Sequence, residues 1–198
     1  GASVVMVSGR AARDAHRVVG HEFDGILGNH GAELLRERRV RDWIGGDMKA
    51  IDAAAEAIEE TIRESWSDVQ IELKGRSIAL HHRLAPVQVT RLLRDVRRAL
   101  DGSDVVALRG RRVIDVRGRD ADKGSAVMLW LEEEENGKVP LEHVLYAGDD
   151  TTDEDAFRAL GSAAVTIAVG RRPREGRFRT LGPQTLARWL SRLKQERR

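Results

Sequence analysis

Two hydrophobic patterns alternate near both ends of the chain: short continuous apolar runs, and longer segments of helical composition that follow them after a loop. Short runs bounded by glycine and polar residues are typical of buried strands, and apolar residues three or four positions apart are typical of helices. The pattern therefore predicts an α/β organisation for the two ends. The expected strands are Ser3–Val7, Val144–Ala147 and Val165–Val169, and the expected helices cover residues 11–19, 122–130 and 184–193, with one more that begins near Thr151 or Thr152.

The middle of the chain has a different pattern. Residues 47–65 place apolar side chains such as Ile51 and Ile58 at helical spacing, whereas residues 69–74 alternate apolar and polar with period two. The order helix, two strands, helix, two strands predicts an antiparallel sheet with two helices on one face. The other expected elements are strands at 77–83, 105–108 and 113–116, and a helix that begins at Pro86.

This α+β pattern interrupts the α/β pattern, which indicates a domain inserted into another. We expect the inserted domain at residues 36–117. The core domain would then consist of residues 1–35 and 118–198.

Composition and charge exclude several classes of protein. The 34 Lys and Arg residues nearly balance 32 Asp and Glu residues, and both signs are interleaved, so we expect no nucleic-acid partner. The one cationic run, Arg171–Arg179, is expected to be a solvated loop. The absence of cysteine excludes disulfide bonds and thiolate metal sites. No apolar run is long enough for a membrane span and no signal peptide is recognisable, so we expect no membrane association and a cytoplasmic location.

Three carboxylates follow the apolar run Val144–Ala147 directly. Asp149 and Asp150 stand where the expected strand ends, and Asp153 lies one helical turn further along. Open α/β sheets bind ligands at the carboxyl ends of their strands, and carboxylate oxygens suit Mg²⁺. The alternative is a solvated, acidic helix N-terminus without a ligand.

Two further segments have features of anion sites. Ser8 and Gly9 follow the first expected strand, so their hydroxyl and N–H groups could bind a phosphate, although a simple turn explains them equally well. Lys123 lies in the first turn of an expected helix, where the helix dipole disfavours a cation, and such a local conflict points to a function such as anion binding. His30, in a loop flanked by glycines, could be a ligand or a base, but a structural role is the commoner one.

Glu72 and Lys74 share one face of the expected sheet because side chains alternate along a strand. They could be ordinary solvent-facing charges. They could equally line a cleft for a hydroxyl-rich ligand, and the pattern alone favours the first interpretation.

Three motifs in chain order resemble motifs two, three and four of the haloacid-dehalogenase-type phosphatases. They are Val7-Ser-Gly-Arg10, Asp122-Lys-Gly124 and Gly148-Asp-Asp-Thr-Thr-Asp-Glu-Asp-Ala-Phe157. Within that superfamily, other segments are similar to those of the trehalose-6-phosphate phosphatases: Gly28-Asn-His-Gly-Ala-Glu33, Ile71-Glu-Leu-Lys74, Leu80-His-His-Arg83 and Val113-Ile-Asp-Val-Arg117. The resemblance covers essentially the whole chain, and it implies a Rossmann-like core with an inserted α+β cap domain.

The resemblance also implies an activity, the hydrolysis of trehalose 6-phosphate to trehalose and phosphate with Mg²⁺ as cofactor. Lys123 and Ser8 would act on the phosphate, with Gly9 beside Ser8. Asp149 and Asp153 would hold Mg²⁺, with Asp150 in support. The residues that would contact the substrate are Asn29, His30, Glu33, Glu72, Lys74 and Arg83.

One family motif has no counterpart in this sequence. The strand with Asp-x-Asp-Gly-Thr, which supplies the nucleophile and one metal ligand in that family, does not occur, and the Asp-Gly pairs at Asp24 and Asp101 lack the second aspartate. We therefore expect a core without its first strand, in a chain that does not turn over by itself. The sequence would then be either an N-terminally incomplete fragment of a longer phosphatase or a natural remnant. An alternative is a non-catalytic module that binds a sugar phosphate or partners a trehalose-phosphate synthase. A related phosphatase for another sugar phosphate is a third possibility.

Overall fold

The structure is a computed structural model that describes residues 2–20, 23–45, 47–110, 112–133, 137–171 and 175–196. The chain divides into two compact units, residues 1–122 and residues 123–198. Each unit has its own sheets and helices, and the two are described separately.

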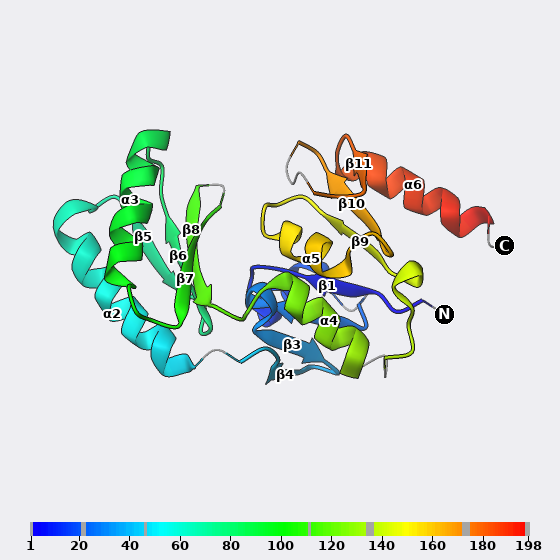
Figure 1. Cartoon of the computed structure of the whole chain (residues 1–198), viewed down its shortest axis with the longest axis horizontal. Helices are drawn as coiled ribbons and strands as arrows, with labels where there is room; N and C mark the ends of the chain where they lie inside the picture. Colours follow the sequence, from blue (N-terminus) through cyan, green and yellow to red (C-terminus); the bar gives the residue numbers. More distant parts are fainter. Residues whose placement is uncertain are drawn as a thin grey trace. The chain divides into compact units, whose positions relative to one another are not determined.

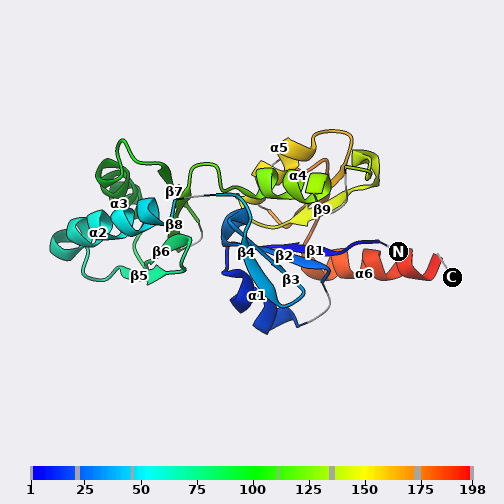
Figure 2. The same cartoon turned by 90° about the horizontal axis from the view of Figure 1, so that it is seen from below.

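The first unit begins with a four-stranded sheet in the order β1-β2-β3-β4. Strands β1 (Val5–Val7) and β2 (Gly25–Gly28) are parallel, whereas β3 (Glu33–Arg36) and β4 (Arg39–Asp42) continue the sheet antiparallel. Helix α1 (Ala12–Val19) lies against one side of this sheet (Figure 2), where its buried alanines contact buried side chains of β2 and β3. The expected strand and helix at the start of the chain are confirmed.

The β3–β4 hairpin was not predicted from the sequence. Its turn residues, Glu37 and Arg38, have φ angles of 49° and 65°, a left-handed conformation that hairpin turns usually assign to Asn or Gly. The local turn signal is therefore missing. Since β4 pairs with β3, the first sheet extends to Asp42, inside the range expected for the inserted domain. The boundaries 36–117 stay a prediction.

The rest of the first unit is an antiparallel sheet covered by two helices, as the order of elements predicted. Figure 1 shows α2 and α3 side by side on one face of this sheet, and their apolar side chains form one core with those of the strands. The sheet order is β5-β6-β8-β7, and every neighbouring pair is antiparallel. The elements are α2 (Met48–Ser65), β5 (Gln70–Leu73), β6 (Ser77–His81), α3 (Pro86–Ala99), β7 (Val105–Arg109) and β8 (Val113–Gly118).

The second unit is an α/β body with a parallel sheet in the order β11-β10-β9. Helices α4 and α5 pack so closely at Gly124 that a Cβ on this residue would overlap the carbonyl of Asp155. The elements are α4 (Lys123–Glu133), β9 (Leu145–Gly148), α5 (Asp153–Leu160), β10 (Val165–Val169), β11 (Phe178–Thr180) and α6 (Pro183–Glu196) (Figure 1). Among the described residues, β1 pairs only with β2, and β9 pairs only with β10. The expected absence of the first strand of the core stays a prediction.

The expectation of a solvated loop over Arg171–Arg179 is wrong at its end. Strand β11 begins at Phe178 and pairs with β10, and the Arg177 N–H donates to Thr166 Oγ1 at 3.0 Å. A three-residue edge strand with a charged flank has too little alternation to be recognised. Residues 172–174 of this run lie outside the described residues. Within the described part of the chain, no helix combines the length and apolar character needed to cross a membrane.

Candidate functional site

The acidic loop after β9 is organised by Asp153, whose side chain turns inward. Oδ1 accepts hydrogen bonds from Lys123 Nζ at 2.7 Å and from the Tyr146 hydroxyl at 2.9 Å. Oδ2 accepts the N–H of Asp150 at 2.9 Å. Asp153 is 4% exposed and Lys123 is 7% exposed, so this is a buried ion pair at the carboxyl end of a strand.

Two local features position this pair. Gly148 ends β9 directly against Asp153, where any Cβ would overlap the aspartate side chain. Burial, followed by the charge of Asp153, raises the pKa of Tyr146 well above its usual value of 10.0, so its hydroxyl remains a donor. The cation in the first turn of α4, noticed as a conflict in the sequence, is thus stabilised by a carboxylate.

The other two carboxylates face outward. Asp149 is exposed, and half-buried Asp150 uses Oδ1 to accept from the backbone N–H and hydroxyl of Thr151 at 2.7 and 3.3 Å. Thr152 occupies the N-cap position of α5, but its hydroxyl makes no capping bond, and the Asp150–Asp153 bond closes the turn instead. The described residues contain no group of three His, Cys, Asp or Glu that could hold a metal.

Of these carboxylates, Asp149 suits direct coordination of Mg²⁺ better than Asp153 does. Mg²⁺ is usually bound through one or two carboxylates and keeps waters, which a substrate phosphate can replace. Asp149 has the exposure that such a ligand needs, whereas both oxygens of Asp153 already accept hydrogen bonds from the protein.

In the first unit, the loop after β1 contains Ser8 and Gly9. Ser8 Oγ accepts the N–H of Arg10 at 3.1 Å, so the hydroxyl proton can be donated to a ligand. Gly9 lies under the ring of His30, because a Cβ on Gly9 would stand 2.7 Å from His30 Cε1. A larger residue at this position would have to displace the His30 ring.

His30 is buried and adopts a left-handed conformation with φ 59°. Its Nε2 lies 3.8 Å from Asp115 Oδ1, and neither ring nitrogen has a hydrogen-bond partner within the described part of the chain. A buried ring with two unsatisfied nitrogens beside the Ser8 loop is a candidate to bind a ligand.

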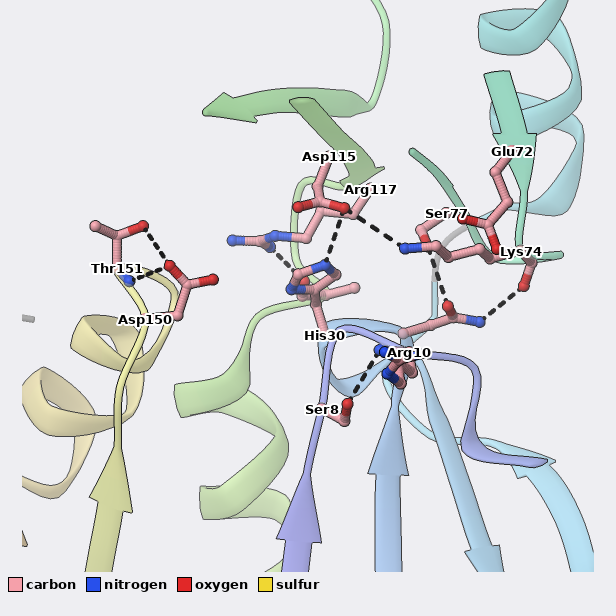
Figure 3. Close-up of polar contacts among 12 residues, drawn as sticks. Ser8, Arg10, His30, Glu72, Lys74, Ser77, Asp115, Arg117, Asp150 and Thr151 are labelled. Carbon is pink, nitrogen blue, oxygen red and sulfur yellow. Dashed lines mark hydrogen bonds and ion pairs between the residues drawn. The ribbon is translucent and has the colours of Figure 1, made fainter. Parts of the chain in front are cut away.

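The sheet face opposite α2 and α3 gathers polar side chains (Figure 3). Strand register puts Glu72, Ala79 and Asp115 in one row. Lys74 Nζ lies 3.7 Å from Asp115 Oδ1 (Figure 3). His81 Nε2 lies 2.7 Å from Glu72 Oε2. The shared face that the alternation predicted for Glu72 and Lys74 is thus part of a larger polar surface.

Asp115 was missed in the sequence as a member of this surface, although a lone carboxylate inside an apolar strand was a signal. Burial alone would raise the pKa of Asp115, but the approach of His30 and the charges of Lys74 and His81 outweigh it and lower the pKa below 3.8. Asp115 therefore remains an ionised carboxylate within this polar surface.

The remaining expected site residues divide into two kinds. Arg83 is exposed just beyond the end of β6. Asn29 is fully buried and Glu33 is half-buried, and they are joined by a 2.6 Å hydrogen bond from Asn29 Nδ2 to Glu33 Oε1.

The α/β fold, the cap-like α+β body and the acidic loop define a phosphatase fold of the haloacid-dehalogenase type. The sequence model described as "Trehalose-phosphatase" matches residues 2–181. The chain belongs to the trehalose-phosphatase family.

Individual relatives agree with this assignment. A probable trehalose-phosphate phosphatase of Sinorhizobium fredii is 33% identical over 86% of this chain and 63% of its own length. A bifunctional trehalose-6-phosphate synthase/phosphatase of Thermoproteus tenax is 30% identical over 89% of this chain and 24% of its length. The structure of Aspergillus fumigatus trehalose-6-phosphate phosphatase aligns with a TM-score of 0.65 and 25% identity, covering 98% of this chain and 78% of that one. The chain spans 24% and 63% of the length of these two curated relatives.

Proposed function

We propose that this chain binds trehalose 6-phosphate and takes part in its hydrolysis to trehalose and phosphate. Membership of the family and the names of the relatives support this substrate. The observation that carries the proposal is the polar sheet face around Asp115, where the exposed Glu72–His81 pair lies beside the more buried Lys74–Asp115 pair. Such charged side chains suit a ligand rich in hydroxyl groups.

In this proposal the sugar contacts the cap-like body. Glu72 and Lys74 would accept from and donate to sugar hydroxyls, while Arg83, exposed beyond β6, would reach the ligand from the strand end. His30 would contact the ligand between the Ser8 loop and the polar sheet face, since its ring lies against Gly9 and near Asp115.

The phosphate would be bound by a hydroxyl and a cation. Ser8 would donate its hydroxyl proton to a phosphate oxygen, with the Gly9 N–H beside it. Lys123 would attract the phosphate, and the buried Asp153 would orient this lysine.

Mg²⁺ is part of the proposal. Asp149 would be its protein ligand and Asp150 would support it, while Asp153 would act through Lys123 rather than through direct coordination. Bound there, the ion would offset the charge of the phosphate. The nucleophilic aspartate of the family has no counterpart in the sequence, so we expect ligand binding without turnover by this chain alone.

Isothermal titration calorimetry with trehalose 6-phosphate, once in the presence of Mg²⁺ and once in the presence of a chelator, tests this function. We expect tighter binding than for glucose 6-phosphate, weakened by chelation. Glu72→Ala should reduce the affinity, and Glu59→Ala on the exposed side of α2 is the matched control. Equal affinities for both sugar phosphates, or equal effects of the two variants, would reject the proposed substrate. Phosphate release in the same samples would show that another group supplies the attack.

We also propose that a trehalose-phosphate synthase is the partner of this chain, because the relative from Thermoproteus tenax combines the two activities in its name. Size-exclusion chromatography of this chain with such a synthase tests it. Co-elution is expected, and separate elution at micromolar concentrations would argue against a stable complex.

A further inference from the structure

The turn between β5 and β6 is fastened to the first sheet by one buried side chain. Asn29 Nδ2 donates to the backbone carbonyl of Lys74 at 2.9 Å, and Asn29 Oδ1 accepts from Ser77 Oγ at 3.0 Å. A second link joins Arg76 in the same turn to Asp42 at the end of β4. The cap-like sheet therefore meets the β1–β4 sheet at this turn.

The Asn29 side chain is also hydrogen-bonded to Glu33. Asn29 Nδ2 gives its other proton to Glu33 Oε1 at 2.6 Å, and Glu33 Oε2 accepts the N–H of Ala12, the first residue of α1, at 2.9 Å. Both amide protons and the amide oxygen of Asn29 are thus used within the protein, and the residue is 0% exposed. Such a side chain has little capacity left for a ligand.

The backbone of Asn29 is tied to the Ser8 loop. Its N–H donates to the carbonyl of Arg10 at 2.7 Å, and the next N–H, that of His30, donates to the carbonyl of Ser8 at 3.0 Å. The left-handed φ of 47° at Asn29 lets one residue make both sets of bonds, with its backbone toward the Ser8 loop and its side chain toward Lys74.

We propose that Asn29 is a positioning residue that fixes the distance between the Ser8 loop and the Lys74 end of the polar sheet face. This inference rests on the proposed function, in which the Ser8 loop binds phosphate and Lys74 binds sugar. A ligand that carries both groups gains affinity only when the two subsites are held at the right separation. Asn29, with Glu33 and Ser77 as its partners, therefore selects a sugar phosphate by length, without contact to the ligand.

The positional role can be tested without any ligand. The chain contains no cysteine, so spin labels at Val18→Cys on α1 and Val87→Cys on α3, which are 74% and 77% exposed, report one distance across the first unit. We expect a narrow distance distribution that broadens in Asn29→Ala and in Ser77→Ala. Ser103→Ala, which loses a 2.5 Å hydrogen bond to Leu100 O away from the turn, is the matched control. Unchanged distributions in both test variants would overturn the inference.

Selection by length is tested by binding three probes: trehalose 6-phosphate, trehalose, and inorganic phosphate. Asn29→Ala should lower the affinity for trehalose 6-phosphate roughly tenfold while leaving those for the two fragments within about twofold, because only the linked ligand depends on the spacing. Equal losses for all three probes would indicate a general structural role and overturn the selection. If the unchanged chain binds none of them, the proposed function fails and the selection with it. The spin-label distances would still decide whether Asn29 fixes the two parts.

Discussion

Replacing Asp153 tests how the acidic loop is built. Asp153→Ala leaves the Lys123 ammonium, 7% exposed, without this counter-ion at 2.7 Å, and removes the acceptor of the Tyr146 hydroxyl. Breaking a buried ion pair from one side costs about 3–5 kcal/mol. The Asp150 N–H also loses its acceptor, but it lies in a half-buried turn that water can reach. We therefore expect the free energy of unfolding to fall by about 4 kcal/mol.

Urea unfolding followed by tryptophan fluorescence measures this loss. Trp130 on α4 is 4% exposed and lies in the same unit, so it contributes to the signal together with the other three tryptophans of the chain. A double-mutant cycle of Asp153→Asn with Lys123→Met should give a coupling energy of about 2 kcal/mol, because the two side chains share one interaction. Arg158→Ala is the control. It removes ion pairs with Asp155 at 3.0 Å and with Glu175 at 2.9 Å, but the arginine side chain is 59% exposed, so the loss of stability should stay below about 1 kcal/mol.

Two results would refute this reasoning. Additive losses in the cycle would mean that Lys123 and Asp153 do not stabilise each other. A loss from Asp153→Ala no larger than that from Arg158→Ala would mean that the carboxylate is hydrated, and direct coordination of Mg²⁺ by Asp153 would become the better interpretation.

Three further changes test other parts of the structure. Gly148→Ala should cost about 1–3 kcal/mol of stability in thermal unfolding, because its Cβ would overlap Asp153, whereas Gly182→Ala, with open space around it, should not; equal effects would contradict the close packing. Asp115→Asn should lower the free energy of unfolding by about 1–2 kcal/mol at pH 7, and its stability should approach that of the unchanged chain below pH 3.8, because the Asp115 carboxylate stabilises the fold only while it is ionised. A stability difference that stays constant down to pH 2.5 would argue against the lowered pKa. Burial, followed by the charges of Arg109 and His81, lowers the pKa of His82 below 6.5, and its ring nitrogens have no hydrogen-bond partner in the described residues. His82→Phe should therefore raise the free energy of unfolding by about 1 kcal/mol at pH 7.5 and by more at pH 5.5, where only the unfolded histidine takes up a proton. Equal gains in stability at both pH values would contradict the lowered pKa.

Sequence patterns predicted most of the elements because their signals are local. The helix beginning near Asp47, the period-two segment at 69–74 and the apolar run Val165–Val169 each express a periodicity within one element. The β3–β4 hairpin and β11 lack such signals, since one turn is built from Glu37 and Arg38 and the other strand is three residues long.

The site could be predicted only as far as residues close in sequence carry its chemistry. The acidic loop was found because Asp149, Asp150 and Asp153 are neighbours. The pairing of Asp115 with Lys74 depends instead on the register between strands that are far apart in the chain, which no local pattern encodes.

A polar residue in a candidate loop does not reveal whether it binds a ligand or holds the loop. Asn29 and His30 are adjacent, both are buried and both have a left-handed backbone, so the sequence treats them alike. Their hydrogen bonds separate them: every polar atom of the Asn29 amide is satisfied within the protein, whereas neither ring nitrogen of His30 has a hydrogen-bond partner among the described residues. Because a buried polar group without a partner is costly, it persists where a ligand or a water completes it. On this ground we propose that, of these two neighbours, His30 contacts the substrate and Asn29 sets where the substrate can lie.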